Sequence, residues 1–149
     1  MKKKELNQLK VTETTDEQSL KEALKLRQEV FVKEQKVPAK LEFDGKDKEA
    51  IHFVAFLADE VVGTCRLLMG NGSGKLERMA VKKEWRGYGI GSALLAEVIK
   101  TTKKTKLSQI SIHAQLQAKD FYLNQGFKAV NEEIFVEAGI EHIKMNMKL

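Results

Sequence analysis

Residues 86–92 read Arg86-Gly87-Tyr88-Gly89-Ile90-Gly91-Ser92, with three glycines at alternate positions. An apolar, strand-like run precedes this segment, and apolar residues at helical spacing follow it. We therefore expect a strand, this loop and then a helix that begins near Gly89. Glycines make a poor helix start, because each loses chain entropy on folding and Ser, Asp or Asn caps a helix better. A ligand that must approach the backbone closely explains the glycines better.

The loop has the features of an anion-binding site. The N–H groups in the first turn of a helix lack intrahelical acceptors, and the helix dipole is positive there. Arg86 adds a positive charge, so we expect phosphate or pyrophosphate to bind. The alternative is a plain glycine-rich turn.

Two other phosphate-binding loops do not fit the sequence. The alternate glycines do not give the GxGxxG spacing of a dinucleotide site. Residues 70–75 resemble a P-loop superficially, but they have too few residues between the glycines, and Leu76 stands where Ser or Thr is required. We interpret 70–75 as a hairpin turn.

The composition indicates one domain over residues 1–149, with residues 1–8 loose. The chain is 42% hydrophobic and has one proline. The single cysteine, Cys65, lies in a strand-like run and is expected in the core rather than as a nucleophile. No apolar run is long enough to span a membrane, and we expect a cytoplasmic protein.

The charges do not favour a nucleic-acid partner. The excess positive charge comes from 22 lysines scattered among 21 acidic residues, a pattern typical of a solvated surface. Arginine clustered with aromatic residues, which nucleic-acid sites favour, is not visible. Three of the four arginines, Arg27, Arg66 and Arg78, hint at a carboxylate or phosphate on a substrate, because their planar forks suit fixed anions.

Hydrophobic periodicity predicts the remaining elements. A strand at 9–14 precedes a helix at 16–33, for which Thr15 and Gln18 resemble a capping box. Strands at 51–57, 61–69 and 75–81 form an antiparallel meander. After the glycine loop and its helix come a strand at 108–114, a short helix at 118–124, and a hairpin of 127–136 with 142–147. The order β-α-β-β-β-α-β-α-β-β predicts a mixed sheet of α/β (α+β) class.

The glycine loop also matches the pattern Arg/Gln-x-x-Gly-x-Gly/Ala through Arg86, Gly89 and Gly91, after a strand that ends in Ala80-Val81. In this the chain resembles the GCN5-related N-acetyltransferases (GNAT), whose loop of this form binds the pyrophosphate of acetyl-CoA. The element order is also that of the family, so the resemblance covers nearly the whole chain. The N-terminal half looks like a little-characterised bacterial branch.

A second segment supports the resemblance. Ala118, Tyr122, Gly126 and Phe127 match the family pattern Asn-x-x-Ala-x-x-x-Tyr-x-x-x-Gly-Phe. The sequence departs from this pattern at Gln115, where the family often has Asn. The Gln side chain is longer than that of Asn and could make a similar amide contact.

The resemblance implies an acyl-CoA N-acyltransferase fold with a splayed central strand pair, and acetyl-CoA as cosubstrate without a metal. It implies acetyl transfer to a primary amine of a small molecule or protein by direct attack on the thioester. The backbone of the strand would hold the pantetheine arm and polarise the carbonyl. The cofactor-binding residues that it implies are Met79, Ala80, Val81, Arg86, Gly87, Tyr88, Gly89, Ile90, Gly91, Ser92, Gln115 and Tyr122.

This chemistry needs an acid and a base. A primary amine has a pKa near 10, so only about one molecule in a thousand is neutral at pH 7, and the leaving thiolate needs a proton. The resemblance makes Tyr122 the proton donor; the alternative is a buried structural tyrosine. We predict Glu77 as the base, because alternation places it on the strand face of Met79 and Val81; it could instead pair with a lysine or arginine.

Other candidates for the base stay open. His52 and His113 lie on expected strands, where a histidine is more often a core residue. The three histidines are too dispersed for a metal site. Glu42, Asp44 and Asp47 form either a solvated loop or a rim that attracts a cationic amine.

Two other functions compete with this one. A non-catalytic acyl-CoA sensor would keep the same glycine loop without turnover. The acyl-homoserine-lactone synthases share the scaffold and are faintly echoed in the first half, but their usual tryptophan after the first helix is missing. The acceptor is open, and the chain could be a monomer or a homodimer.

Overall fold

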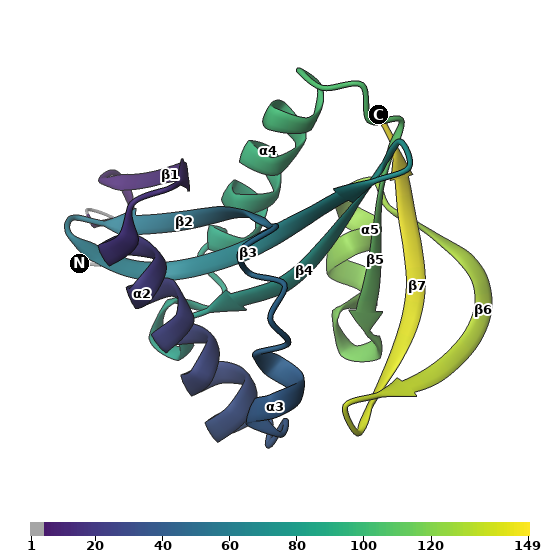
Figure 1. Ribbon diagram of the computed structural model, residues 1–149, viewed down its shortest axis with the longest axis horizontal. Helices are drawn as coiled ribbons and strands as arrows, with labels where there is room; N and C mark the ends of the chain where they lie inside the picture. The colour runs from purple at the N-terminus through teal and green to yellow at the C-terminus, as the bar shows by residue number, and fades with distance from the viewer. Residues whose placement is uncertain (1–4) are drawn as a thin grey trace.

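The computed structural model describes residues 5–149 (Figure 1). The elements in order are β1 (Leu9–Thr14), α2 (Glu17–Arg27), the π-helix η1 (Gln28–Glu34), α3 (Ala39–Glu42), β2 (Ile51–Leu57), β3 (Glu60–Gly70), β4 (Ser73–Val81), the 3-10 turn η2 (Lys83–Trp85), α4 (Ile90–Thr102), β5 (Gln109–Gln115), the 3-10 turn η3 (Leu116–Ala118), α5 (Lys119–Asn124), β6 (Lys128–Glu137) and β7 (Ile140–Lys148). The predicted order of strands and main helices is confirmed. The short elements η1 and α3 were not predicted as such.

The seven strands form one mixed sheet in the order β1-β2-β3-β4-β5-β7-β6. Every neighbouring pair is antiparallel except β4 and β5, which are parallel. Helices α2 and α4 cover opposite faces (Figure 1). The mixed α/β fold is therefore confirmed.

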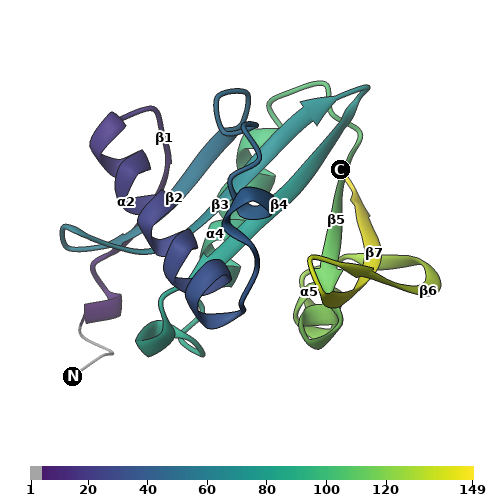
Figure 2. The same cartoon turned by 60° about the horizontal axis from the view of Figure 1, so that its bottom comes forward.

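The central strand pair is splayed, as expected. Backbone pairing of β4 with β5 runs from Ser73 with Gln109 to Leu76 with Ile112, although both strands continue beyond. Figure 2 shows β5, β7 and β6 apart from the strands β1–β4 over much of their length. Among residues 5–149, the separation leaves the β5-facing edge of β4 beyond Leu76 without a neighbouring strand.

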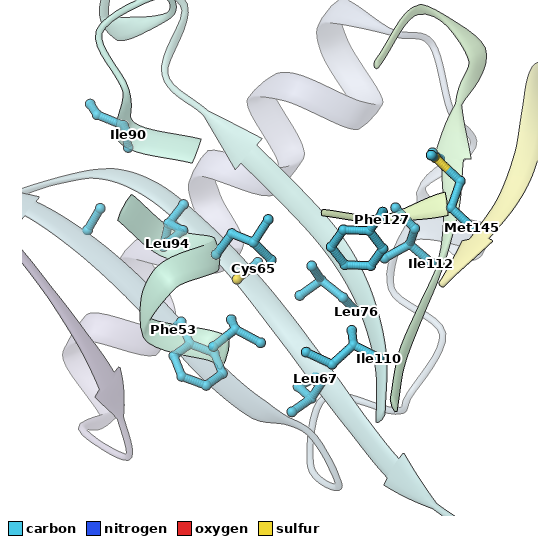
Figure 3. Close-up of a cluster of buried hydrophobic side chains, with 14 of the residues drawn as sticks. Phe53, Cys65, Leu67, Leu76, Ile90, Leu94, Ile110, Ile112, Phe127 and Met145 are labelled. Carbon is cyan, nitrogen blue, oxygen red and sulfur yellow. The ribbon is translucent and has the colours of Figure 1, made fainter. Parts of the chain in front are cut away.

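The main core lies on the α4 face of the sheet (Figure 3). Its buried side chains include Leu94 of α4, Phe53 of β2 and Ile112 of β5. Cys65 is 1% exposed within this cluster, and burial raises the pKa of its thiol. The position of Cys65 in the core is confirmed.

The first helix differs from its prediction at both ends. Its N-cap is Asp16 rather than Thr15, because the Asp16 carboxylate accepts hydrogen bonds from the backbone N–H and hydroxyl of Ser19 at 3.0 and 2.7 Å. After Arg27 the chain continues as η1, so the predicted single α-helix becomes an α-helix followed by a short π-helix.

The N-terminal segment was expected to be loose. Residues 1–4 lie outside the described residues. Residues 5–8 form a turn in which the Gln8 N–H donates to the Glu5 carbonyl at 2.9 Å, and Leu6 packs against the core.

A bulge in β4 changes which residues share a face. Arg66 pairs with Glu77 and Thr64 with Ala80, so Arg78 and Met79 together oppose one residue of β3. Arg78 has φ 59°, a left-handed conformation that accommodates the extra residue. The prediction that Glu77 shares a face with Met79 and Val81 is therefore wrong, because the bulge reverses the alternation between them.

Among residues 5–149, no helix has the length and apolar character needed to cross a bilayer.

Candidate active site

One cavity of about 880 Å³ opens where β4 and β5 separate. Its walls come from η1, α3, β4, the glycine loop, β5, α5 and the β6–β7 turn. The predicted catalytic residues Tyr122 and Glu77 line it, as does every predicted cofactor-binding residue except Tyr88. A separate pocket of about 590 Å³ beside α2 contains none of them.

The glycine loop has a backbone that only glycine adopts readily. Gly87 and Gly89 have φ of 83° and 82°, and Gly89 is the N-cap of α4 without a capping side chain. The first hydrogen bond of α4 runs from the Ala93 N–H to the Gly89 carbonyl at 3.0 Å. The N–H groups of residues 90–92 therefore precede the helical hydrogen-bond ladder, which is the arrangement that an anion site uses.

Gly91 keeps space open on the inner side of the loop. A Cβ at this position would lie 3.2 Å from Cζ of Phe121 and 3.7 Å from Sδ of Met79. A larger side chain would therefore fill the space between α4, α5 and the end of β4.

The Arg86 guanidinium is already engaged. It donates to both carboxylate oxygens of Glu34 at 2.6 and 2.9 Å and to the Val81 carbonyl at 2.9 Å. The hydrogen bonds from Arg86 lower the pKa of Glu34. This pair ties η1 to the glycine loop, and a contact of Arg86 with a bound anion stays a prediction.

The Tyr122 hydroxyl reaches the point where the strands separate. It donates to Sδ of Met79 at 3.7 Å, and its ring lies edge-on to Phe121 and Phe127 at centroid distances of 5.0 and 5.5 Å. Burial raises the pKa of Tyr122, so its hydroxyl stays protonated at neutral pH. Within residues 5–149 its only acceptor is this weakly accepting sulfur, so the hydroxyl is available to donate elsewhere.

Gln115 joins β5 to the end of η1 across the cavity. Its amide nitrogen donates to the side-chain oxygen of Gln35 at 2.8 Å, and its own side-chain oxygen accepts from Gln117 at 3.0 Å. A contact of Gln115 with a cofactor stays a prediction.

A network of ion pairs ties the loop after α3 to the sheet. Arg66, which is 0% exposed, pairs with Asp44 at 2.8 Å, Asp47 at 3.0 Å and Glu77 at 2.8 Å. Arg27 pairs with Glu42 and Asp47, each at 2.7 Å. Arg78 pairs with Glu42 at 2.9 Å and Asp44 at 3.4 Å.

This network corrects two interpretations of the sequence. Glu42 is 2% exposed and pairs with Arg27 and Arg78, so the acidic segment is not simply a solvated loop. Glu42 and Asp44 line the cavity, and a rim that attracts a cationic amine stays a prediction. The three arginines bind the protein's own carboxylates and need no anion on a substrate. These partners lie 11 to 36 residues apart in the chain, so local sequence patterns could not reveal the pairs.

Glu77 lines the cavity, but its carboxylate forms ion pairs with two cationic side chains. Besides Arg66 it contacts Nζ of Lys75 at 3.2 Å. Burial raises the pKa of Glu77, but the charge of Lys75 and the hydrogen bond from Arg66 outweigh it, so the net effect lowers the pKa. Glu77 therefore does pair with a lysine and an arginine, and the role of Glu77 as a base stays a prediction.

The histidines separate into two groups. His52 is buried on β2, where Nε2 lies 2.8 Å from the Asp47 carbonyl, and it is outside the cavity lining. His113 and His142 line the cavity together with Glu137, and Nδ1 of His113 lies 3.1 Å from Oε1 of Glu137. Sequence reasoning missed Glu137 and His142, which lie in a hairpin without a recognisable motif.

No group of three or more His, Cys, Asp or Glu side chains within residues 5–149 is arranged to hold a metal ion.

Known proteins resemble the chain over nearly its whole length. A family model described as an acetyltransferase (GNAT) domain matches residues 10–149. The uncharacterised N-acetyltransferase YjcF of Bacillus subtilis is 38% identical over 92% of this chain and 98% of its own. Escherichia coli ElaA superimposes with a TM-score of 0.83 at 27% identity over 93% of this chain and 99% of its own.

A more distant structure shows the same fold. A GNAT family acetyltransferase from Elizabethkingia anophelis, whose structure has acetyl-CoA bound, gives a TM-score of 0.72 at 19% identity over 96% of this chain and 99% of its own. The family model spans most of the chain, and the glycine loop and splayed strands lie within it. The chain therefore belongs to the GNAT acetyltransferase family.

Proposed function

We propose that this protein binds acetyl-CoA between β4 and β5 and transfers the acetyl group to a primary amine. One observation carries the proposal: a glycine-rich helix start and an available tyrosine hydroxyl border the same cavity at the point where the two strands separate. Membership of the GNAT acetyltransferase family supports acyl transfer from CoA.

The glycine loop would bind the pyrophosphate. The N–H groups of residues 90–92 and the positive end of the α4 dipole supply the attraction, and Gly89 lets the phosphates approach the backbone. The acetyl-CoA bound to the fold neighbour from Elizabethkingia anophelis supports a CoA cosubstrate here.

The free edge of β4 would orient the thioester. Beyond Leu76 no strand of the described part of the chain lies beside this edge, so backbone groups of Met79–Val81 can contact the pantetheine arm and polarise the carbonyl. Tyr122 would then donate its proton to the sulfur as the C–S bond breaks, because its hydroxyl is protonated and lies beside Met79.

Glu77 stays a candidate for the base, but its ion pairs with Arg66 and Lys75 reduce its basicity. Its lowered pKa means that it holds a proton less readily than an ordinary glutamate.

The test measures release of free thiol from acetyl-CoA with a panel of primary amines, in the wild type and in Tyr122→Phe. The variant keeps the ring packing and removes the hydroxyl, so kcat should fall about 10²-fold while the dissociation constant of acetyl-CoA stays within about twofold. An unchanged kcat would remove Tyr122 from the mechanism. Tight acetyl-CoA binding without thiol release for any amine would favour the sensor instead.

A further inference from the structure

We propose that His113, held by Glu137, is the general base that takes the proton from the acceptor amine. The proposal rests on the acetyl transfer proposed above and identifies the residue that makes the amine reactive. It also places the acceptor on the η1 face of the sheet, opposite α4.

The position of His113 on β5 supports this role. Ile112 and Ala114 are buried in the core on the α4 face, so alternation turns His113 to the other face. The last backbone pair between β4 and β5 is Leu76 with Ile112. His113 is therefore the first residue of β5 beyond the paired region, at the start of the splay, and it lines the cavity.

The surroundings of His113 orient its ring. Nδ1 lies 3.1 Å from Oε1 of Glu137, and the Phe135 ring packs edge-on at a centroid distance of 5.0 Å. An imidazole whose Nδ1–H donates to a carboxylate keeps its Nε2 lone pair for a substrate proton. Within residues 5–149, Nε2 of His113 has no hydrogen-bond partner, and the side chain is 27% exposed.

Other ionisable groups surround this imidazole. Glu77 follows the last paired residue of β4, and Lys144 is the register partner of His113 on β7. His142 lies on the far side of Glu137, with its Nε2 3.9 Å from Oε2. Of the carboxylates, Glu77 is held by two cations, whereas Glu137 faces the two imidazoles. Imidazole is also the side-chain base suited to proton transfer near neutral pH.

The acid and the base then approach the thioester from opposite faces of the sheet. Tyr122 packs against the α4-face core, whereas His113 lies on the η1 face. Nε2 takes one proton from the ammonium group, and the neutral nitrogen attacks the carbonyl carbon. As the C–S bond breaks, Tyr122 gives its proton to sulfur and is reprotonated from solvent, while the new amide nitrogen sheds its second proton to solvent. The imidazolium returns its proton to solvent, so the products are the amide, CoA thiol and one proton.

The test compares His113→Gln with the wild type in the thiol-release assay, with benzylamine, spermidine and a lysine-containing peptide as acceptors. We expect kcat/KM at pH 7 to fall about 10²-fold, with the acetyl-CoA dissociation constant unchanged. The loss should shrink as the pH rises toward 9, because more of the amine is already neutral, and added imidazole should restore part of the rate. A purely structural role would produce neither effect.

Two further variants complete the design. Glu137→Ala should reduce kcat/KM about tenfold, because it removes the acceptor that orients the ring. Ser111→Ala, two residues earlier on the same face of β5 and outside the cavity lining, should leave activity unchanged.

The outcomes separate the two proposals. If the wild type turns over and kcat/KM of His113→Gln at pH 7 lies within about threefold of the wild-type value, the assignment of His113 as the base is wrong. A loss of activity that imidazole does not rescue and that is the same across the pH range would also overturn this assignment. No wild-type turnover with any amine would overturn the proposed function itself, and the base with it.

Discussion

The buried Arg66 offers the clearest energetic test of the site's framework. Its guanidinium makes hydrogen bonds to Asp44, Asp47 and Glu77, and none of its side chain is exposed. Arg66→Met keeps most of the apolar stem and removes the charge. The loop after α3 would then lose its main attachment to β3 and β4.

The expected loss of folding free energy in Arg66→Met depends on which cationic partners the three carboxylates keep. Removing one member of a buried ion pair costs about 3–5 kcal/mol, because the partner is left unpaired. Here Asp47 keeps Arg27 at 2.7 Å, Glu77 keeps Lys75 at 3.2 Å and Asp44 keeps Arg78 at 3.4 Å. We therefore expect the lower end, about 3 kcal/mol, or roughly 6–12 °C in Tm for a domain of this size.

Urea denaturation monitored by circular dichroism measures the change in the free energy of unfolding. Lys75→Met is the matched control, because Lys75 pairs with the same Glu77 from a side chain that is 37% exposed. Exposed pairs contribute about 0–1 kcal/mol, so this variant should stay within about 1 kcal/mol of the wild type. A loss below about 1 kcal/mol in Arg66→Met, equal to that of the control, would refute the account of a tightly coupled buried network.

Further predictions follow from the same contacts. The Arg66 hydrogen bond lowers the pKa of Asp44, and Arg27 and Arg66 lower that of Asp47 in spite of its burial. A carboxylate whose pKa is lower in the folded than in the unfolded state stabilises the protein above the unfolded pKa, near 4, and this stability is lost as the pH falls further. The urea concentration at the unfolding midpoint should therefore decrease as the pH is lowered below about 4, and it should decrease less steeply in Arg66→Met. Equal slopes in the two proteins would contradict this. Gly63→Ala should lose about 1–3 kcal/mol, because its Cβ would lie 2.8 Å from Cγ2 of Ile90, whereas Gly70→Ala meets no atom within 4 Å and should be nearly neutral in the same denaturation assay.

The sequence sufficed for the features that depend on local patterns. Alternation and helical periodicity located the seven strands and the main helices, because each amphipathic segment buries one side. The glycine loop was recognisable because a left-handed backbone at Gly87 and Gly89 requires glycine.

The errors came from contacts between distant segments and from one backbone irregularity. The bulge at Arg78 has no glycine to mark it, and it moved Glu77 to the other face. The acidic segment looked solvated because its arginine partners come from α2, β3 and β4. Likewise, Glu137 meets His113 because β7 pairs with β5 and brings the end of the β6–β7 hairpin beside it.

The central claim is that the glycine loop binds the pyrophosphate of acetyl-CoA, and calorimetric titration of acetyl-CoA into Gly89→Asp tests it most directly. Gly72→Asp is the matched control, because Gly72 has a similar φ of 74° and an added Cβ would likewise meet no atom within 4 Å, but it lies in the β3–β4 turn. We expect Gly89→Asp to weaken acetyl-CoA binding at least about 10²-fold through repulsion of the phosphates, while acetyl-pantetheine, which lacks them, binds both variants as it binds the wild type. Equal affinity of wild type, Gly89→Asp and Gly72→Asp for acetyl-CoA, or no binding of any CoA ester by the wild type, would contradict the claim.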